Sequence, residues 1–296
     1  MPTQPRLPND TSLGWVKLRV ADRERSLRFY RDVLGYQVDL PDDQTARLRP
    51  APDRSAHFVL VELPGAVPRP RRSTGLYHAA ILLPHRRELA RVIRRLVDSG
   101  WPIGGVADHG VSEAIYLDDA EGNGLEIYAD RPRSAWPAQG QQVAMYTDPL
   151  DLPDLLRELE ADPRPWSAMP AEARVGHVHL QVSDLDRAEE FYCGVLGFEV
   201  TQRSYPGALF VSAGGYHHHL GLNIWNSRRA GPPPENATGL LAFAIVIPER
   251  SAWEAAVERV RAAGLPVEEG LRDEYGVGVV TRDFDRIGVE LWTPAV

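Results

Sequence analysis

The residues of this sequence best suited to chemistry are histidines and a glutamate on short apolar stretches. Residues 217–219 are three consecutive histidines, and apolar residues alternate directly after them, as in a half-buried strand. His177 lies on a second alternating stretch and Glu290 on a third. Imidazole and carboxylate groups bind divalent metals, and a neutral imidazole can also carry protons. Each side chain could instead be packed or hydrogen-bonded in the core, so its position in the fold decides its role.

The elements that position these residues belong to an internal repeat. The pattern around Lys17 returns around His179 without a gap over about twenty positions, at an offset of 162 residues (179 minus 17). A later pair of segments, 124–127 and 288–291, also matches. The chain therefore consists of two similar halves, residues 10–131 and 174–296. The connector between them, residues 132–173, is rich in Pro and Ala and contains one short helical pattern.

Each half divides again into two units of the same order. In the first unit an alternating strand (15–20) precedes a helical pattern (23–34) that ends at Gly35, and three short alternating runs follow. The same order begins again near residues 76, 177 and 241. The sequence therefore predicts an α+β fold of four βαβββ modules.

Composition limits the classes of function. The chain has 296 residues, of which 43% are hydrophobic, enough for two ordinary domains without a membrane span or an apolar signal segment. The net charge of −8 argues against nucleic acids and anionic membranes as partners. Cys193 is the only cysteine, so no intramolecular disulfide forms, and we expect it to be a buried structural thiol. These features predict a soluble, cytoplasmic protein.

Four βαβββ units in two pairs resemble the vicinal oxygen chelate superfamily of glyoxalases, fosfomycin-resistance proteins and extradiol dioxygenases. Within it, the chain looks most like bacterial catechol 2,3-dioxygenases. Three stretches carry this resemblance: GGYHHHLGLNIW at 214–225, LYHA at 76–79, and DDAEGNGLEIYADRP at 118–132. The resemblance implies modules paired into two half-barrel domains, with the metal in the C-terminal one.

The resemblance also implies a ligand set, because superfamily ligands lie on the first and last strands of each module. It assigns the metal to His177, His219 and Glu290, with Ala242 at an inert fourth position. Two histidines and one carboxylate are the ligands of non-heme Fe(II) oxygenases, and Mn(II) is an alternative. His218 matches the position of the acid–base histidine, whereas strand alternation favours His217 beside His219, and the sequence leaves both open.

The N-terminal half also carries residues at ligand positions. His78 and Glu126 occupy those of the second module, His57 lies near that of the first, and Trp15 takes the remaining corner. A second metal site is one interpretation of this set. We favour the other, in which these residues are a relic of duplication that now makes structural hydrogen bonds.

The function implied by the resemblance is Fe(II)-dependent extradiol cleavage of a small aromatic diol by O₂, in an enzyme that can form a homo-oligomer. Two alternatives remain. One is a glyoxalase-like, metal-dependent lyase or isomerase that needs no O₂. The other is a metal-free protein that binds an aromatic ligand such as an antibiotic.

Overall fold

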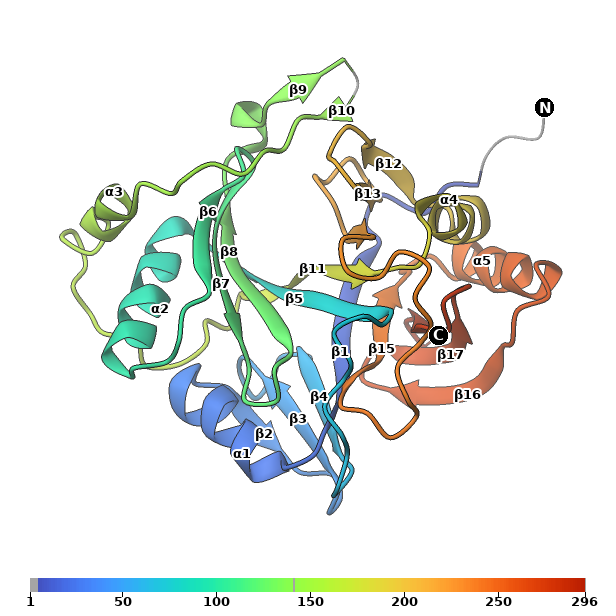
Figure 1. The fold of residues 1–296 in the computed structure, drawn as a ribbon, viewed down its shortest axis with the longest axis horizontal. Helices are drawn as coiled ribbons and strands as arrows, with labels where there is room; N and C mark the ends of the chain where they lie inside the picture. The colour runs from blue at the N-terminus through green and yellow to red at the C-terminus, as the bar shows by residue number, and fades with distance from the viewer. Residues whose placement is uncertain (1–4, 141, 296) are drawn as a thin grey trace.

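The computed structural model describes residues 5–140 and 142–295, which form two curled eight-stranded sheets with helices at the periphery (Figure 1). The predicted α+β fold of four βαβββ modules is confirmed. No helix in the described part of the chain is both long and apolar enough to cross a bilayer.

The modules follow one another along the chain, with short additional elements in the connector. The first module comprises β1 (Ser12–Val20), α1 (Arg23–Leu27), η1 (Arg28–Val33), β2 (Gln37–Asp39), β3 (Thr45–Arg49) and β4 (Phe58–Glu62). The second comprises β5 (Gly75–Leu83), α2 (Arg86–Asp98), β6 (Gly105–Asp108), β7 (Ser112–Asp118) and β8 (Gly124–Asp130). The connector contains η2 (Arg133–Ala135), β9 (Ala138–Gln139), β10 (Gln142–Val143) and α3 (Leu152–Arg157). The third module comprises β11 (Arg174–Gln181), α4 (Leu185–Glu189), η3 (Glu190–Leu196), β12 (Glu199–Gln202), β13 (Ala208–Ser212) and β14 (Leu220–Asn223). The fourth comprises β15 (Gly239–Val246), α5 (Arg250–Ala262), β16 (Glu268–Asp273), β17 (Gly276–Arg282) and β18 (Gly288–Thr293).

The repeat is visible in how the first helix of each half begins and ends. The carboxylates of Asp22 and Asp184 accept backbone N–H groups of the first helical turn, which caps α1 and α4. Gly197 ends η3 with φ 102°, a left-handed conformation that glycine adopts at little cost. Gly35, at the matching position, has φ 78°. Local sequence therefore sets the same boundaries twice.

The pairing of modules differs from the expected one. The strand order is β16-β17-β18-β15-β1-β4-β3-β2 in one sheet and β12-β13-β14-β11-β5-β8-β7-β6 in the other. Strand β1 pairs antiparallel with β15, and β5 with β11, so each sheet takes one module from each half of the chain (Figure 1). The expectation that each half folds into its own half-barrel is thus corrected. The segments 63–74 and 224–238 are long enough to carry the chain from one sheet to the other.

Each half of the chain has one equivalent hydrogen bond that links its two modules. The Tyr30 hydroxyl donates to Asp119 (3.0 Å), and the Tyr192 hydroxyl donates to Asp283 (2.9 Å). Burial raises the pKa of the Asp119 carboxyl and that of Asp283, the latter to about 7. Sheet pairing and these contacts together connect all four modules.

The connector and the cysteine match the sequence analysis. The predicted short helix is α3, and it packs on α2 through an ion pair between Arg86 and Asp154 (2.5 Å). Cys193 is buried in η3, as predicted, and burial raises the pKa of its thiol to about 12.

Candidate metal centre

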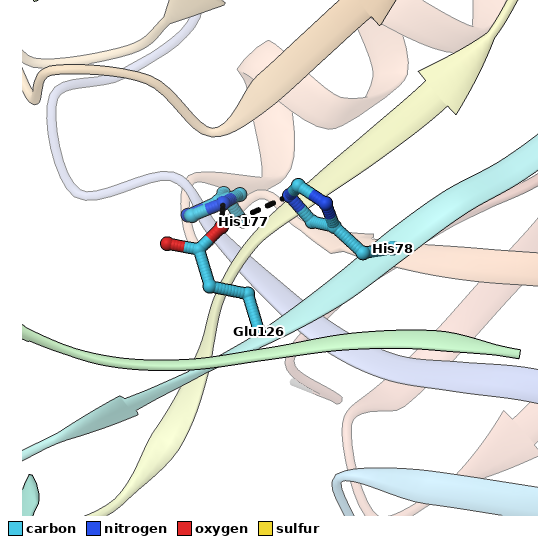
Figure 2. Close-up of side chains that lie close together, drawn as sticks. All are labelled: His78, Glu126 and His177. Carbon is cyan, nitrogen blue, oxygen red and sulfur yellow. Dashed lines mark hydrogen bonds and ion pairs between the residues drawn. The ribbon is translucent and has the colours of Figure 1, made fainter. Parts of the chain in front are cut away.

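Three potential metal ligands converge on one face of the sheet formed by the second and third modules. They are His78 from β5, Glu126 from β8 and His177 from β11, and all three side chains are buried. Figure 2 shows the two imidazole rings and the carboxylate pointing toward one another. Oε2 of Glu126 lies 3.0 Å from Nε2 of His78 and 3.1 Å from Nε2 of His177. This is the one group of three or more potential ligands found among the described residues.

Strand register explains why these residues meet. Ala80 on β5 pairs with Glu126 on its parallel neighbour and with His177 on its antiparallel neighbour. His78 lies two residues before Ala80 and therefore points to the same face of the sheet. Three adjacent strands thus place their side chains around one point.

The arrangement fits a divalent metal ion. Two ligands bound at right angles at about 2.1 Å lie about 3.0 Å apart, which matches both separations from the Glu126 oxygen. Despite the short distance, Nε2 of His78 makes no well-directed hydrogen bond to the described residues. Two imidazoles and one carboxylate are also the donor set of non-heme Fe(II) sites. An ion would satisfy buried atoms that the protein leaves without partners.

The protonation states also suit metal binding. Burial lowers the pKa of His177 to about 4, so its imidazole is neutral at neutral pH, as a ligand must be. Burial acts to raise the pKa of Glu126, but His177 and His78 outweigh it and hold that pKa well below its ordinary value. The set therefore offers a neutral nitrogen from His177 and an anionic oxygen from Glu126.

A fourth corner of the site is vacant at Gly221. His179 pairs with Gly221 on the parallel strand β14, as Ala80 pairs with Glu126 in the second module. Gly221 thus holds the position that corresponds to Glu126, and it has no side chain to offer. A Cβ atom at this position would lie 2.8 Å from the His179 ring. The inert corner beside this cluster is therefore Gly221 and not Ala242.

The structure does not bring His177, His219 and Glu290 together, and this corrects the expected ligand set. Glu290 lies on β18 in the other sheet, where its carboxylate accepts from Lys17 Nζ (2.5 Å) and from two indole N–H groups. Its partners occupy the space that an ion would need. Of the three residues, His177 alone belongs to the cluster.

His219 lies outside the cluster because the backbone before β14 is irregular. Its Nδ1 accepts the Ala213 N–H (3.2 Å), and its ring lies against Tyr216. It lines a separate small cavity together with Arg174. Strand alternation does not apply to residues 217–219, which precede the first residue of the strand.

The residues interpreted from sequence as a relic of duplication have different surroundings in the structure. His78 and Glu126, interpreted from sequence as structural remnants, complete the cluster with His177. Glu290 is the carboxylate that lacks histidine neighbours. His57 is structural: its Nε2 donates to the Ala173 carbonyl (2.9 Å), and its Nδ1 accepts from the Tyr36 hydroxyl (2.8 Å).

A sequence signal for the cluster existed. The second and third modules carry His78, Glu126 and His177 at ligand positions, whereas the first and fourth carry Trp15, Ala242 and Glu290 at the matching ones. If modules two and three share a sheet, the first set is a complete triad. The pairing of modules two and three in one sheet is what local sequence patterns do not reveal.

The cluster opens onto a cavity of about 260 Å³. The ring of His218 borders this cavity, with its centroid 4.1 Å from that of His177, and His217 is fully buried. Burial holds the pKa of His218 well below its ordinary value. Aromatic residues form much of the wall, and Tyr77 and Trp225 are partly exposed. None of the described lining residues is Arg or Lys.

The two halves of the chain, residues 12–127 and 174–293, both match the Glyoxalase/Bleomycin resistance protein/Dioxygenase superfamily. The chain belongs to this superfamily. Among its relatives is a catechol-2,3-dioxygenase of Bacillus subtilis (strain 168), 48% identical over 264 residues, which cover 88% of this chain and 91% of the relative.

Solved structures from this superfamily share the fold. Glyoxalase I of Zea mays matches with a TM-score of 0.60 and 17% identity, over 96% of this chain and 92% of its own. A Bacillus subtilis protein matches with a TM-score of 0.64 and 14% identity, over 98% of this chain and 87% of its own. At these identities, the structural likeness is evidence for the fold alone.

Proposed function

We propose that this protein is an extradiol dioxygenase that cleaves the ring of a small, neutral catechol with O₂, using Fe(II) held by His78, Glu126 and His177. Mn(II) suits the same donor set, because ligand type alone does not separate these two metals. The observation that carries the proposal is the buried two-histidine, one-carboxylate cluster at the wall of an aromatic cavity. An identity of 48% to a catechol-2,3-dioxygenase over most of both chains makes the protein an enzyme of the dioxygenase type.

The cluster leaves room for a chelating substrate. When bound, the metal supplies Lewis acidity to two adjacent ring oxygens and an open position for O₂. The three residues would hold that ion, and Gly221 would add no fourth ligand beside the cavity. The cavity walls orient the ring and exclude water, which keeps the diol and O₂ next to each other.

His218 is the residue best placed to take up a proton from the diol. It borders the cavity beside His177, and burial keeps its imidazole neutral, so it can act as a base. We assign the acid–base role to His218 and a supporting position to His217, which does not border the cavity.

The cavity favours small, uncharged diols. Its volume of about 260 Å³ lies just below the usual range for drug-sized ligands, about 300–1,000 Å³, so a single ring suits it better than a fused system. A ring carboxylate would enter a desolvated site in which no Arg or Lys side chain among the described lining residues could pair with it. We therefore expect catechol and alkyl catechols to be preferred over 3,4-dihydroxybenzoate.

Anaerobic reconstitution with Fe(II), followed by an oxygen-electrode assay, tests the proposal. We expect O₂ uptake and a ring-opened product with catechol, and at least tenfold lower kcat/KM with 3,4-dihydroxybenzoate. Zn(II)-loaded protein is the control and should bind catechol without consuming O₂. Absence of O₂ uptake with every diol, despite bound Fe(II), would contradict the proposal. Turnover of a hemithioacetal without O₂ would favour the glyoxalase-like alternative, and catechol binding by protein that takes up no metal would favour sequestration.

A further inference from the structure

A chain of hydrogen bonds runs from the cavity to the partly exposed end of β8. Nδ1 of His218 lies 2.8 Å from Nδ1 of His217, whose Nε2 lies 2.9 Å from Oδ1 of Asp130. Asp130 also accepts from the Tyr216 hydroxyl, at 3.0 Å to Oδ2. The two histidines are buried, and Asp130 is partly exposed. The three residues therefore link the cavity wall to the protein surface.

The direction of each hydrogen bond follows from the one between His217 and Asp130. An ionised carboxylate only accepts, so Nε2 of His217 must carry the proton that it shares with Asp130. When His217 is neutral, this is its one ring proton, so Nδ1 of His217 is an acceptor. In that state, the proton between the two rings belongs to Nδ1 of His218. This leaves Nε2 of a neutral His218 unprotonated.

The geometry points to Asp130 as a positioning residue that acts through His217 to hold His218 in the tautomer whose free nitrogen, Nε2, is a proton acceptor. The inference rests on the proposed function only for its catalytic consequence. If His218 accepts a proton from the diol at Nε2, a ring with the opposite tautomer already carries a proton on that nitrogen and cannot do so. The comparable role of the aspartate in serine proteases shows that the wrong tautomer is costly even where the geometry is kept.

Asp130 and the proposed metal ligand Glu126 lie on the same strand, β8. Glu126, Tyr128 and Asp130 alternate along β8 and so share a face. The Tyr128 ring packs against His177, and its hydroxyl donates to that of Tyr216 (2.8 Å), because the Tyr216 proton is already given to Asp130. One strand of the second module thus fixes both the ligand and the orientation of the histidines from the third.

The tautomer can be measured without any turnover. Full-length protein labelled with ¹⁵N-histidine and loaded with diamagnetic Zn(II) gives two-bond ¹H–¹⁵N spectra that distinguish Nδ1-protonated, Nε2-protonated and doubly protonated rings. His218→Gln and His217→Gln assign the signals. We expect His218 to be protonated at Nδ1 and His217 at Nε2. An Nε2-protonated His218, or a doubly protonated His217, overturns the inference in the wild-type protein alone.

Two variants test the role of the carboxylate. Asp130→Leu keeps the size of the side chain but removes the acceptor, and we expect His218 to become a mixture of tautomers. Tyr216→Phe is the matched control, because it removes another hydrogen bond to Asp130 and leaves the carboxylate in place. It should keep the single tautomer. Unchanged His218 signals in Asp130→Leu would overturn the inference.

The catalytic consequence is measured with Fe(II)-loaded protein and catechol. We expect Asp130→Leu to lower kcat by about ten- to a hundredfold, a part of the total effect of a general base, with KM within about twofold. Tyr216→Phe should stay within about threefold of wild type. A tautomer change with unaltered kcat would overturn the positioning role. If the wild-type protein turns over no diol, the proposed function fails, and the NMR result still decides the tautomer.

Discussion

Replacing Glu126 tests the metal centre most directly. Glu126→Gln preserves the shape of the side chain but removes the one anionic donor of the cluster. Oε2 of Glu126 is the atom that lies 3.0 and 3.1 Å from the two imidazole nitrogens, so its loss affects the contacts with both histidines. We expect the variant to fold, since Gln keeps the shape of the side chain and can still form hydrogen bonds, and to bind metal far more weakly.

The size of the loss can be bounded. Replacing a residue that merely supports a ligand costs about 10- to 100-fold in metal affinity. Losing one of three protein ligands should therefore cost at least about 100-fold, or roughly 2.7 kcal/mol. Titration of the metal-free protein with Zn(II) or Fe(II) against a chelating dye measures this difference, and metal analysis of the purified protein checks it.

Glu290→Gln is the matched control, because it changes the equivalent strand position in the other sheet. We expect its metal affinity to stay within about twofold of wild type. Its free energy of unfolding should fall by about 1–3 kcal/mol, because Lys17 loses its carboxylate partner but remains partly exposed to water. Strong metal binding by Glu126→Gln together with its loss in Glu290→Gln would refute the assignment and restore the ligand set expected from the sequence.

Three further predictions concern other residues. His218→Gln should lower kcat for catechol by about 10²- to 10⁴-fold, and His219→Gln should leave it within about threefold, as steady-state O₂ uptake will measure. The folded-state pKa of Asp283, about 7, lies above the usual 3.8, so the folded protein binds the extra proton and stability falls as pH rises from about 4 to 7. Asp283→Asn should flatten this slope in urea titrations at pH 5 and pH 8, and an unchanged slope would contradict the assignment. Cys193 should react with iodoacetamide only after unfolding, as intact-mass spectrometry can show, because the buried thiol with a pKa of about 12 holds almost no thiolate.

The sequence predicted what local patterns control. The helix end at Gly35 and the alternating strands follow from neighbouring residues, so the four modules could be derived from them. It did not predict which modules share a sheet, because the first strands β5 and β15 are both nearly continuous apolar runs. That choice depends on long-range pairing, and it decides whether Glu126 or Glu290 faces His177.

The role of the histidine run was also beyond local patterns. Residues 217–219 lie in irregular backbone, so the alternation rule that favoured His217 beside His219 had no strand to act on. The three rings differ in their neighbours: His217 contacts Asp130, and His218 lies against His177. Neither contact can be inferred from the composition or from the repeat.

Because each sheet combines one module from each half of the chain, the two halves exchange modules within a single polypeptide. A polypeptide ending in the loop after α3 would contain β1 and β5 but neither of their antiparallel partners, β15 and β11, and the unpaired edges of both strands would be free to pair with other chains. This fragment and the complementary C-terminal one, produced in one cell, would complete both sheets together. Since His177 comes from one fragment and His78 with Glu126 from the other, uptake of a metal ion would report that the fragments had found each other.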